Sequence, residues 1–285
     1  MNQIVSVITP AYKAEPTIIT TVRSVLAQTW PDWEMLIIAD DGADYEKLLA
    51  DVGLRDPRFK FLDSGKIGGG ASNARNVALE QLQTGYAAIL DADDRLKPQK
   101  LERAVAALEH HGIVTTALDV MDEGFNHLRD VGAGPDRTLT PSQYKWISVS
   151  MDSMLVWDTS KADGRYDLTM SNMTDLAFLL QLYRTVPASF HLGTPLHDYI
   201  KRAGSMSNGA KTAAGMIASK TTLLDRLGSG YYPLASADGA EGIEAFLHVS
   251  LQAEALYGAA LAAKPGLLFE DHLEPMLAAS DLSPF

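Results

Sequence analysis

Segments with the pattern of buried strands alternate with segments with the pattern of helices over roughly the first 110 residues. Short β-branched and apolar runs predict strands over Ile4 to Thr9, Trp33 to Ala39, Arg58 to Leu62 and Tyr86 to Leu90. Apolar residues at helical spacing predict helices over Thr17 to Gln28, Tyr45 to Val52, Ser72 to Gln83 and Pro98 to His110. Because neighbouring parallel strands need a crossover between them, this order predicts an α/β fold with a mostly parallel sheet and helices on both faces.

The pattern changes after about residue 113. Strands are predicted over Val114 to Val120, Ser153 to Trp157 and Leu196 to Lys201, with a loop over Val131 to Pro141 and a helix over Asp175 to Thr185. Small polar residues from Ala203 to Lys211 predict a mobile loop, and helices are expected over residues 213–227, 242–263 and 267–279. We therefore expect an α/β domain over residues 1–210 and a C-terminal helical extension over residues 211–285.

Charge and cysteine content exclude several classes of protein. The formal net charge is −12, whereas a nucleic-acid-binding surface needs clustered Lys and Arg, so no nucleic-acid partner is expected. The absence of cysteine excludes disulfides and thiolate metal sites, and it fits a reducing compartment. The N-terminus lacks the pattern of a signal peptide, and no apolar run approaches the roughly 20 residues of a spanning helix. A cytoplasmic protein is expected, with peripheral attachment to the inner face of the membrane left open.

An acidic motif follows the fourth predicted strand. Within four positions the chain places Asp91, Asp93 and Asp94 directly after the apolar run Tyr86 to Leu90. Crowding carboxylates at the end of a strand is unfavourable unless a cation lies among them. Hard oxygen ligands of this kind suit Mg²⁺ or Mn²⁺, which can in turn hold a diphosphate. The competing interpretation is a solvated acidic turn in which one Asp caps the following helix.

Two further strands end in polar residues. The first predicted strand is followed by Pro10, Ala11, Tyr12 and Glu15, and the second by Asp40 and Asp41. In an open α/β sheet, ligands bind at the edge where the carboxyl ends of the parallel strands meet. The three polar strand ends are therefore expected to form one site.

Four segments, taken in order, resemble family 2 of the glycosyltransferases. They are V-S-V-I-T-P-A-Y-K-A-E, S-V-L-A-Q-T-W-P-D-W-E-M-L-I-I-A-D-D-G-A-D, G-G-A-S-N-A-R-N-V-A-L and I-L-D-A-D-D. The resemblance covers about residues 3–210. It implies the Rossmann-like GT-A fold and transfer of a sugar from a nucleotide sugar, with a uridine diphosphate (UDP) sugar as the expected donor.

In that family the first two strand ends hold the nucleotide. The resemblance therefore assigns the base and ribose to Pro10, Ala11, Tyr12, Glu15 and Asp40. A carboxylate can accept from the base or ribose, and Tyr12 offers a stacking face. Asp41 is a further candidate, although in D-D-G it is also a turn-former. The alternative for Tyr12 and Glu15 is a surface turn and helix start.

The remaining motifs are assigned to the diphosphate and the metal. The resemblance gives Arg75 the bracing of the nucleotide site, Asp91 the donor ribose or sugar, and Asp93 the metal ion, Mn²⁺ or Mg²⁺. Arg202 lies in a segment that resembles the family's Y-x-x-R-x-x-S-x-S and is expected to contact the diphosphate. The alternative for Arg75 is an exposed helix position. Asp94 is expected either to support the metal ligands without contacting the ion itself or to cap the next helix.

Asp175 is the candidate for the catalytic base. In family members the base is an Asp that opens a helix roughly 80 residues past the metal motif, and Asp175 lies at that place in M-S-N-M-T-D-L-A-F-L-L. An ordinary Asp, with a pKa of about 3.9, is ionised at neutral pH and can accept the proton of an acceptor hydroxyl. Thr174 replaces the Glu usual in the family, and the alternative is a helix N-terminal Asp that complements the dipole.

These assignments together predict an inverting, metal-dependent glycosyltransferase, since one displacement assisted by one base inverts the anomeric carbon. The expected acceptor is a glycan or glycolipid, as in bacterial polysaccharide synthesis. One alternative is a non-catalytic nucleotide-sugar-binding protein. Another is a sugar nucleotidyltransferase, which is disfavoured because no Gly-rich basic signature follows the first strand. The helical extension is open to three roles: a homodimer contact, a cover for the acceptor groove, or a contact with a membrane.

Overall fold

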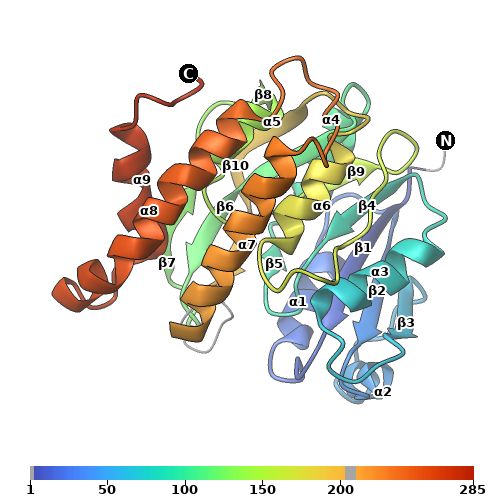
Figure 1. The fold of residues 1–285 in the computed structure, drawn as a ribbon. Helices are drawn as coiled ribbons and strands as arrows, with labels where there is room; N and C mark the ends of the chain where they lie inside the picture. Colours follow the sequence, from blue (N-terminus) through green and yellow to red (C-terminus); the bar gives the residue numbers. More distant parts are fainter. Residues whose placement is uncertain (1–2, 203–209) are drawn as a thin grey trace.

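The computed structural model describes residues 3–202 and 210–285, and its first 110 residues form the predicted alternation of strands and helices (Figure 1). The strands are β1 (Val5–Ala11), β2 (Trp33–Ala39), β3 (Phe59–Asp63) and β4 (Tyr86–Ile89). The helices are α1 (Ile18–Leu26), α2 (Tyr45–Asp51), α3 (Ala71–Gln81) and α4 (Lys100–Leu108). Each element lies within two residues of its predicted ends. The local pattern of apolar residues is therefore sufficient to locate them.

The second half contains the other predicted elements and several that the sequence pattern does not predict. The predicted ones are β6 (Ile113–Met121), β9 (Val156–Asp158), α6 (Thr174–Leu182) and β10 (Ser189–Ile200). The additional ones are β5 (Arg95–Leu96), β7 (His127–Val131), β8 (Arg137–Leu139) and α5 (Pro141–Ile147). The expectation of a loop from Val131 to Pro141 is wrong where β8 pairs with β10.

Two of these differences have local causes. α5 does carry a start signal, because Pro141 is its first residue and Gln143 Oε1 accepts from the amide of Thr140 at 3.2 Å. β10 begins well before its predicted start because it runs through irregular pairing around Pro195. There a Cβ on Gly193 would lie 2.0 Å from the carbonyl oxygen of Gly134, so this close backbone approach requires glycine.

The described strands form one sheet in the order β3-β2-β1-β4-β9-β6-β10-β5, with β7 paired to β6 and β8 to β10. β1 pairs in parallel with β2 and with β4. The carboxyl ends of these three strands are therefore neighbours. β9 is antiparallel to β4 and β6, and β5 is antiparallel to β10. The predicted α/β class is confirmed, with short antiparallel strands added to the parallel ones.

Helices cover both faces of the sheet, as predicted. One apolar cluster joins Val5 and Val7 of β1 to α1, α2 and α4, and a second joins Ile8 of β1 to α3, α5 and α6. All seven residues of β1 are buried, as expected of a parallel strand covered on both faces. Because helices cover both faces, polar groups are found mainly at the edges of the sheet, where the strands end.

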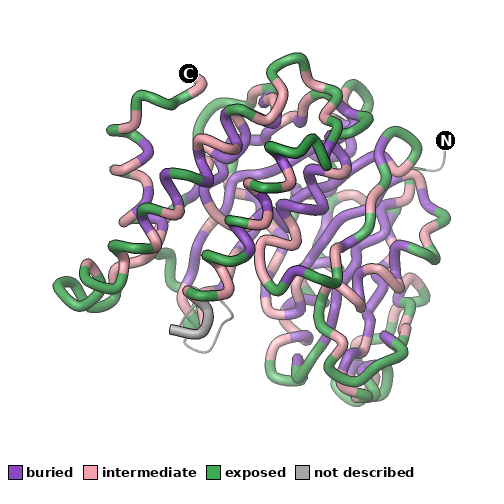
Figure 2. The backbone as a smooth tube through the Cα atoms, in the orientation of Figure 1, coloured by how far each residue is buried: buried purple, intermediate pink, exposed green. Residues whose placement is uncertain are grey.

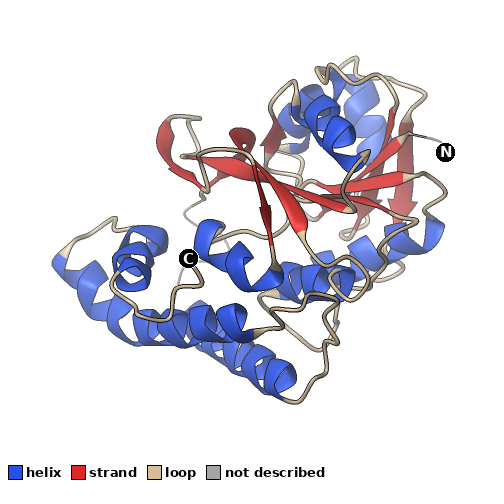
Figure 3. Ribbon diagram, turned by 90° about the horizontal axis from the view of Figure 1, so that it is seen from above, coloured by secondary structure: helices blue, strands red, loops and turns tan. Residues whose placement is uncertain are grey.

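The C-terminal helices α7 (Ala210–Gly228), α8 (Glu241–Ala263) and α9 (Phe269–Ala278) form the predicted helical extension. They make a further layer beside the sheet (Figures 1 and 3), and a third apolar cluster joins them to β6 and α6. Leu118 and Val120 of β6 and Leu176 of α6 belong to this cluster. The predicted boundary near residue 210 therefore separates two segments of sequence that share a core.

The last turns of α8 and the turn after it are mostly exposed (Figure 2). Over residues 3–202 and 210–285, no helix combines the length and the hydropathy needed to cross a membrane. The mobile loop predicted from Ala203 to Lys211 falls largely on residues 203–209, which lie outside the described residues.

Candidate active site

A backbone contact joins the ends of β1 and β2. Pro10 and Ala11 end β1 and are buried, and the carbonyl of Ala11 accepts from the amide of Asp40 at 2.8 Å. Beyond this point Tyr12 and Glu15 are exposed, with 51% of Tyr12 accessible to solvent. Of the residues predicted to hold the base and ribose, Tyr12 and Glu15 therefore offer side chains to a ligand. The side chains of Pro10 and Ala11 are buried.

Asp41 closes the turn that displays Tyr12. Its carboxylate accepts from the amides of Lys13 and Ala43 at 2.5 and 3.0 Å and from the hydroxyl of Tyr45 at 2.8 Å. Burial opposes ionisation, but these three donors together lower the pKa of Asp41. Lys13 has a φ of 51°, a left-handed conformation that is costly for a residue with a side chain. Asp41 thus acts as the turn-former considered from the sequence.

Asp40 fastens the glycine-rich segment before α3 to the end of β2. Asp40 is 2% exposed, and its carboxylate accepts from Ser64 Oγ at 2.7 Å and from the amides of Gly69 and Gly70 at 3.1 and 2.8 Å. A Cβ on Gly69 would lie 2.9 Å from Asn73 Nδ2 and 3.2 Å from Asp40 Oδ1, so a larger residue would require these side chains to shift. Contact between Asp40 and a base stays a prediction, and the carboxylate has a clear structural task besides.

Arg75 joins the acidic motif to α6. The guanidinium lies 2.5 Å from Asp91 Oδ1 through Nη2 and 2.9 Å from Asp175 Oδ1 through Nη1. Arg75 is only 3% exposed, which excludes the exposed helix position considered as its alternative. Burial disfavours its charge, but the two carboxylates outweigh this effect and raise the pKa of Arg75. Two predicted site residues far apart in the sequence, Asp91 and Asp175, are therefore held by one cation.

Asp93 and Arg202 also meet in this region. Arg202 Nε lies 3.3 Å from Asp93 Oδ2, and both side chains are partly exposed. Burial and the charge of Asp91 raise the pKa of Asp93 to about 6, although Arg202 opposes the shift. A carboxyl group whose ionisation is disfavoured in this way gains most from an added cation. The geometry thus brings the predicted metal ligand and the predicted diphosphate contact together.

Asp94 does not cap the following helix, so that interpretation is wrong. The N-cap residue of α4 is Gln99, whereas Asp94 is 1% exposed and accepts from the amide of Ile200 at 2.8 Å. Its other oxygen lies 3.3 Å from Nε2 of the buried His197. Burial lowers the pKa of His197 well below its usual value, and Lys100 Nζ lies 2.8 Å from its Nδ1. Asp94 therefore ties the acidic motif to the end of β10, just before Arg202.

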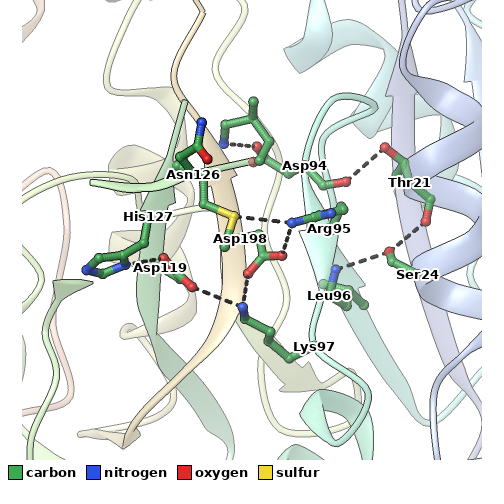
Figure 4. Close-up of polar contacts among 12 residues, drawn as sticks. Thr21, Ser24, Asp94, Arg95, Leu96, Lys97, Asp119, Asn126, His127 and Asp198 are labelled. Atoms are coloured by element: carbon green, nitrogen blue, oxygen red, sulfur yellow. Dashed lines mark hydrogen bonds and ion pairs between the residues drawn. The ribbon is translucent and has the colours of Figure 1, made fainter. Parts of the chain in front are cut away.

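Hydrogen bonds from α1 hold the segment after the acidic motif (Figure 4). Thr21 Oγ1 donates to the carbonyl of Asp94 at 2.8 Å, and Ser24 Oγ accepts from the amide of Leu96 at 3.1 Å. On its other side, β5 is fixed by Asp198 of β10, which pairs with Arg95 at 2.8 Å and with Lys97 at 2.7 Å. The turn that carries Asp91 and Asp93 is thus followed by a strand held from two directions.

A second acidic group lies on the paired strands β6 and β7. The carboxylates of Asp119 and Asp130 and a ring nitrogen of His127 lie within 4.8 Å of one another. Lys97 already pairs with Asp119 at 3.0 Å, and His127 Nδ1 lies 2.7 Å from the other Asp119 oxygen (Figure 4). This hydrogen bond raises the pKa of His127. The sequence pattern did not single out this group, because its members come from two strands of which one was not predicted.

Asp175 lies in the first turn of α6 but does not cap it. The N-cap residue is Met173, which has a φ of 57° and makes no side-chain capping bond. The carboxylate of Asp175 instead accepts from Arg75 and, at 3.0 Å, from the hydroxyl of Tyr166. Burial raises the pKa of Asp175, with Arg75 acting in the opposite direction. A left-handed, non-glycine residue beside this carboxylate is the kind of backbone strain that collects at functional sites.

Sequence reasoning missed a contact from the C-terminal helices. Lys201, which precedes Arg202, pairs with Glu270 of α9 at 2.9 Å, and Glu270 is 3% exposed. Arg129 of β7 forms further ion pairs with Asp271 and Glu274 of the same helix. No local signal predicts such pairs, because they join residues more than 60 positions apart. The helical extension thus supports the strand end that carries Arg202.

Comparisons with known proteins identify the family and the fold of this chain. The family model "Glycosyl transferase family 2" matches residues 6–155. Among individual relatives, the UDP-Glc:alpha-D-GlcNAc-diphosphoundecaprenol beta-1,3-glucosyltransferase WfgD of Escherichia coli is 36% identical over 112 residues, which cover 39% of this chain and 44% of that protein. The putative teichuronic acid biosynthesis glycosyltransferase TuaG of Bacillus subtilis is 44% identical over 110 residues, covering 35% and 40%. The chain thus matches less than half the length of these relatives.

A solved structure shows the same fold over nearly the whole chain. The structure of S. aureus TarS residues 1–349 in complex with UDP-GlcNAc superposes with a TM-score of 0.67 at 17% identity, covering 96% of this chain and 78% of that one. The family model spans more than half of the 285 residues and includes the acidic motif and Arg75. The chain therefore belongs to glycosyltransferase family 2 and has the GT-A fold.

Proposed function

We propose that this chain is an inverting, metal-dependent glycosyltransferase that moves a sugar from a UDP-sugar to a glycan or glycolipid acceptor. The observation that supports this proposal most is the position of Arg75, which contacts both Asp91 of the acidic motif and Asp175 of α6. Both carboxylates are about one-third exposed or slightly less, so each remains open to a ligand. Asp91 suits the donor, and Asp175 suits the incoming hydroxyl of the acceptor.

The residues at the acidic motif suit a hard divalent cation. Asp93 offers a carboxylate whose ionisation is disfavoured by burial and by Asp91, and carboxylate oxygen is a preferred ligand of Mg²⁺ and Mn²⁺. When bound, the cation would neutralise the charge that grows on the departing diphosphate. We infer that Arg202, which lies beside Asp93, would contact the oxygens of this diphosphate.

Asp175 is proposed to take the proton of the acceptor hydroxyl. The bond from the acceptor oxygen to C1 of the sugar forms as the bond from C1 to the phosphate oxygen breaks, and the proton passes to the carboxylate. Arg75 stabilises the ionised form of Asp175 against the effect of burial. Because the hydroxyl attacks from the face opposite the diphosphate, this single displacement inverts the configuration at C1.

The relatives support the class of donor and acceptor. TarS is solved with UDP-GlcNAc, and WfgD is named for UDP-Glc, which supports a UDP-sugar here. WfgD is named for a diphosphoundecaprenol-linked acceptor and TuaG for teichuronic acid biosynthesis, which supports an acceptor in the synthesis of a surface polysaccharide. The exposed ring of Tyr12 is available to stack on the uracil base.

A non-catalytic nucleotide-sugar-binding protein is the second candidate. Thr174 stands before Asp175 in place of the Glu that the resemblance leads us to expect, and this substitution favours the second candidate. Such a protein would bind UDP together with a metal ion but would transfer no sugar. Turnover therefore separates the two functions, whereas binding does not.

Calorimetric titration of UDP tests the metal site. We expect Mn²⁺ to raise the affinity of the wild type for UDP by about tenfold or more, equivalent to about 1.4 kcal/mol. Asp93→Ala should lose this increase, whereas Asp130→Ala, a matched change in the Asp119–His127–Asp130 group, should keep it. Equal affinity with and without metal in the wild type, or loss of the increase in Asp130→Ala only, would contradict the assignment.

Binding of Mn²⁺ with UDP should also weaken as the pH falls through about 6. The pKa of Asp93 is raised to about 6, so below that pH the carboxyl carries a proton that the cation must displace. The same titrations between about pH 5 and pH 8 check this result. An affinity that does not change over that range would count against Asp93 as a ligand.

A further inference from the structure

Tyr166 is a buried side chain that contacts the proposed base. It is 2% exposed, and its hydroxyl donates to Asp175 Oδ1 at 3.0 Å. Its ring stacks on Phe178 of α6, with centroids 4.5 Å apart and an interplanar angle of 6°. The Arg75 guanidinium lies 5.0 Å from the centre of the same ring. The hydroxyl is therefore held in one position relative to Asp175.

The backbone of Tyr166 is fixed by Asn76 of α3. Asn76 Oδ1 accepts from the amide of Tyr166 at 2.7 Å, and Asn76 Nδ2 donates to the carbonyl of Tyr166 at 2.9 Å. Two adjacent residues of α3, Arg75 and Asn76, thus help to hold the carboxylate of Asp175. Arg75 contacts Asp175 directly, and Asn76 acts through Tyr166.

Both hydrogen bonds to Asp175 are accepted by the same oxygen. Arg75 Nη1 and the Tyr166 hydroxyl both donate to Oδ1, whereas Oδ2 accepts no hydrogen bond from the described residues. The side chain of Asp175 is 27% exposed, so solvent and ligands reach part of it. Two donors on one oxygen fix the rotation of the carboxylate and leave the second oxygen to accept a proton.

We propose that Tyr166, held by Asn76, is a positioning residue that aims Oδ2 of Asp175 at the acceptor hydroxyl. This inference rests on the proposed function, since it assigns Asp175 the role of base. It adds the atom that takes the proton and two residues that orient it. Tyr166 is buried and its hydroxyl donates to Asp175, so we assign it a role through that carboxylate, and its removal should slow the chemical step without weakening donor binding.

Tyr166→Phe tests the proposal, because it removes the hydroxyl and keeps the ring that stacks on Phe178. We expect kcat to fall about tenfold, a part of the roughly 100-fold or more that a general base contributes. The KM for the donor should stay within about twofold. Asn76→Ala should lower kcat in the same way, and it provides a second variant if Tyr166→Phe does not fold.

Tyr183→Phe is the matched control. Tyr183 is a buried tyrosine of the same apolar cluster, and its hydroxyl lies 2.8 Å from Ser189 Oγ rather than near Asp175. It should leave kcat unchanged. In an Asp175→Asn background, Tyr166→Phe should add no further loss, because the two residues then act as a unit.

The outcomes separate this inference from the proposed function. A normal kcat in Tyr166→Phe, an equal fall in Tyr183→Phe, or an additive loss with Asp175→Asn would overturn the positioning role and leave the transferase intact. A wild type that transfers no sugar would remove the proposed function and this inference with it.

Discussion

Asp175→Asn should lower the turnover number by roughly 100-fold or more while leaving the affinity for UDP and metal nearly unchanged. The amide keeps the size of the side chain and can still accept from Arg75 and Tyr166, but it cannot take a proton. Steady-state kinetics with a donor and acceptor that the wild type uses, together with UDP titration, give both quantities.

The same substitution distinguishes a base from a carboxylate that only pairs with Arg75. Asp175→Asn removes the charge beside the buried Arg75, so some stability is lost in either case. A carboxylate with only this structural role would leave the turnover number almost unchanged. Asp163→Asn, at an exposed position outside the proposed site, is a suitable control and should be silent. Near-normal turnover in Asp175→Asn would contradict the assignment of Asp175 as the base, and the proton would then have to pass to another group.

Arg75→Met should destabilise the protein by about 3 kcal/mol, the low end of the cost of breaking a buried ion pair, because both carboxylates are partly exposed. Without the guanidinium, Asp91 and Asp175 lose the cation that lies between them. The loss of stability should shrink as the pH falls, because protonation of Asp175 removes the charge that Arg75 compensates. Urea denaturation at several pH values measures this effect.

Turnover of Arg75→Met should fall as well. The removal of Arg75 takes away the charge that opposes the raised pKa of Asp175, so less of the base is ionised at neutral pH. Arg165→Met, in which an exposed arginine is replaced, is the control. Equal stability of Arg75→Met and the wild type would mean that the bridge between Asp91 and Asp175 contributes little to the fold.

The parts of the fold that the sequence predicts are those governed by local pattern. β1 to β4 and α1 to α4 follow from short apolar runs and helical spacing, which report burial directly. β5 has only two residues, β8 has three, and β7 is short and mostly exposed, so their residues show no such pattern. Pairing with β10 and β6 defines them, and pairing depends on the whole sheet.

The candidate site likewise has features that the sequence predicts and features that only the fold defines. Strand order alone predicts that the ends of β1, β2 and β4 lie together, because parallel strands share an edge. The contact between Arg75 and Asp175 joins residues 100 positions apart and requires α3 and α6 to cover the same face of the sheet. Asp40 and Asp94 were expected at the site, but their bonds to Gly70 and Ile200 depend on chain segments that meet only in the fold.

Tyr166 shows most clearly what the sequence does not contain. It lies in the segment before α6 and has no spacing relation to Asp175 that would mark it as a partner. Asn76 stands next to Arg75 in the A-R-N segment, yet its two bonds are to the backbone of Tyr166 and not to a predicted site residue. Residues that orient a reactive group are found from contacts, because their own chemistry is ordinary.

The release of UDP from a panel of UDP-sugars, measured with and without Mn²⁺ or Mg²⁺ and with glycan and polyprenyl-linked acceptors, tests the proposed function most directly. We predict that at least one UDP-sugar is consumed, that release of UDP requires the metal, and that the product has the inverted anomeric configuration. Asp93→Ala should lose the metal-dependent release of UDP, and Asp175→Asn should lower it by roughly 100-fold or more. Metal-dependent binding of UDP without consumption of any donor, or metal-independent turnover that persists in Asp93→Ala, would contradict it.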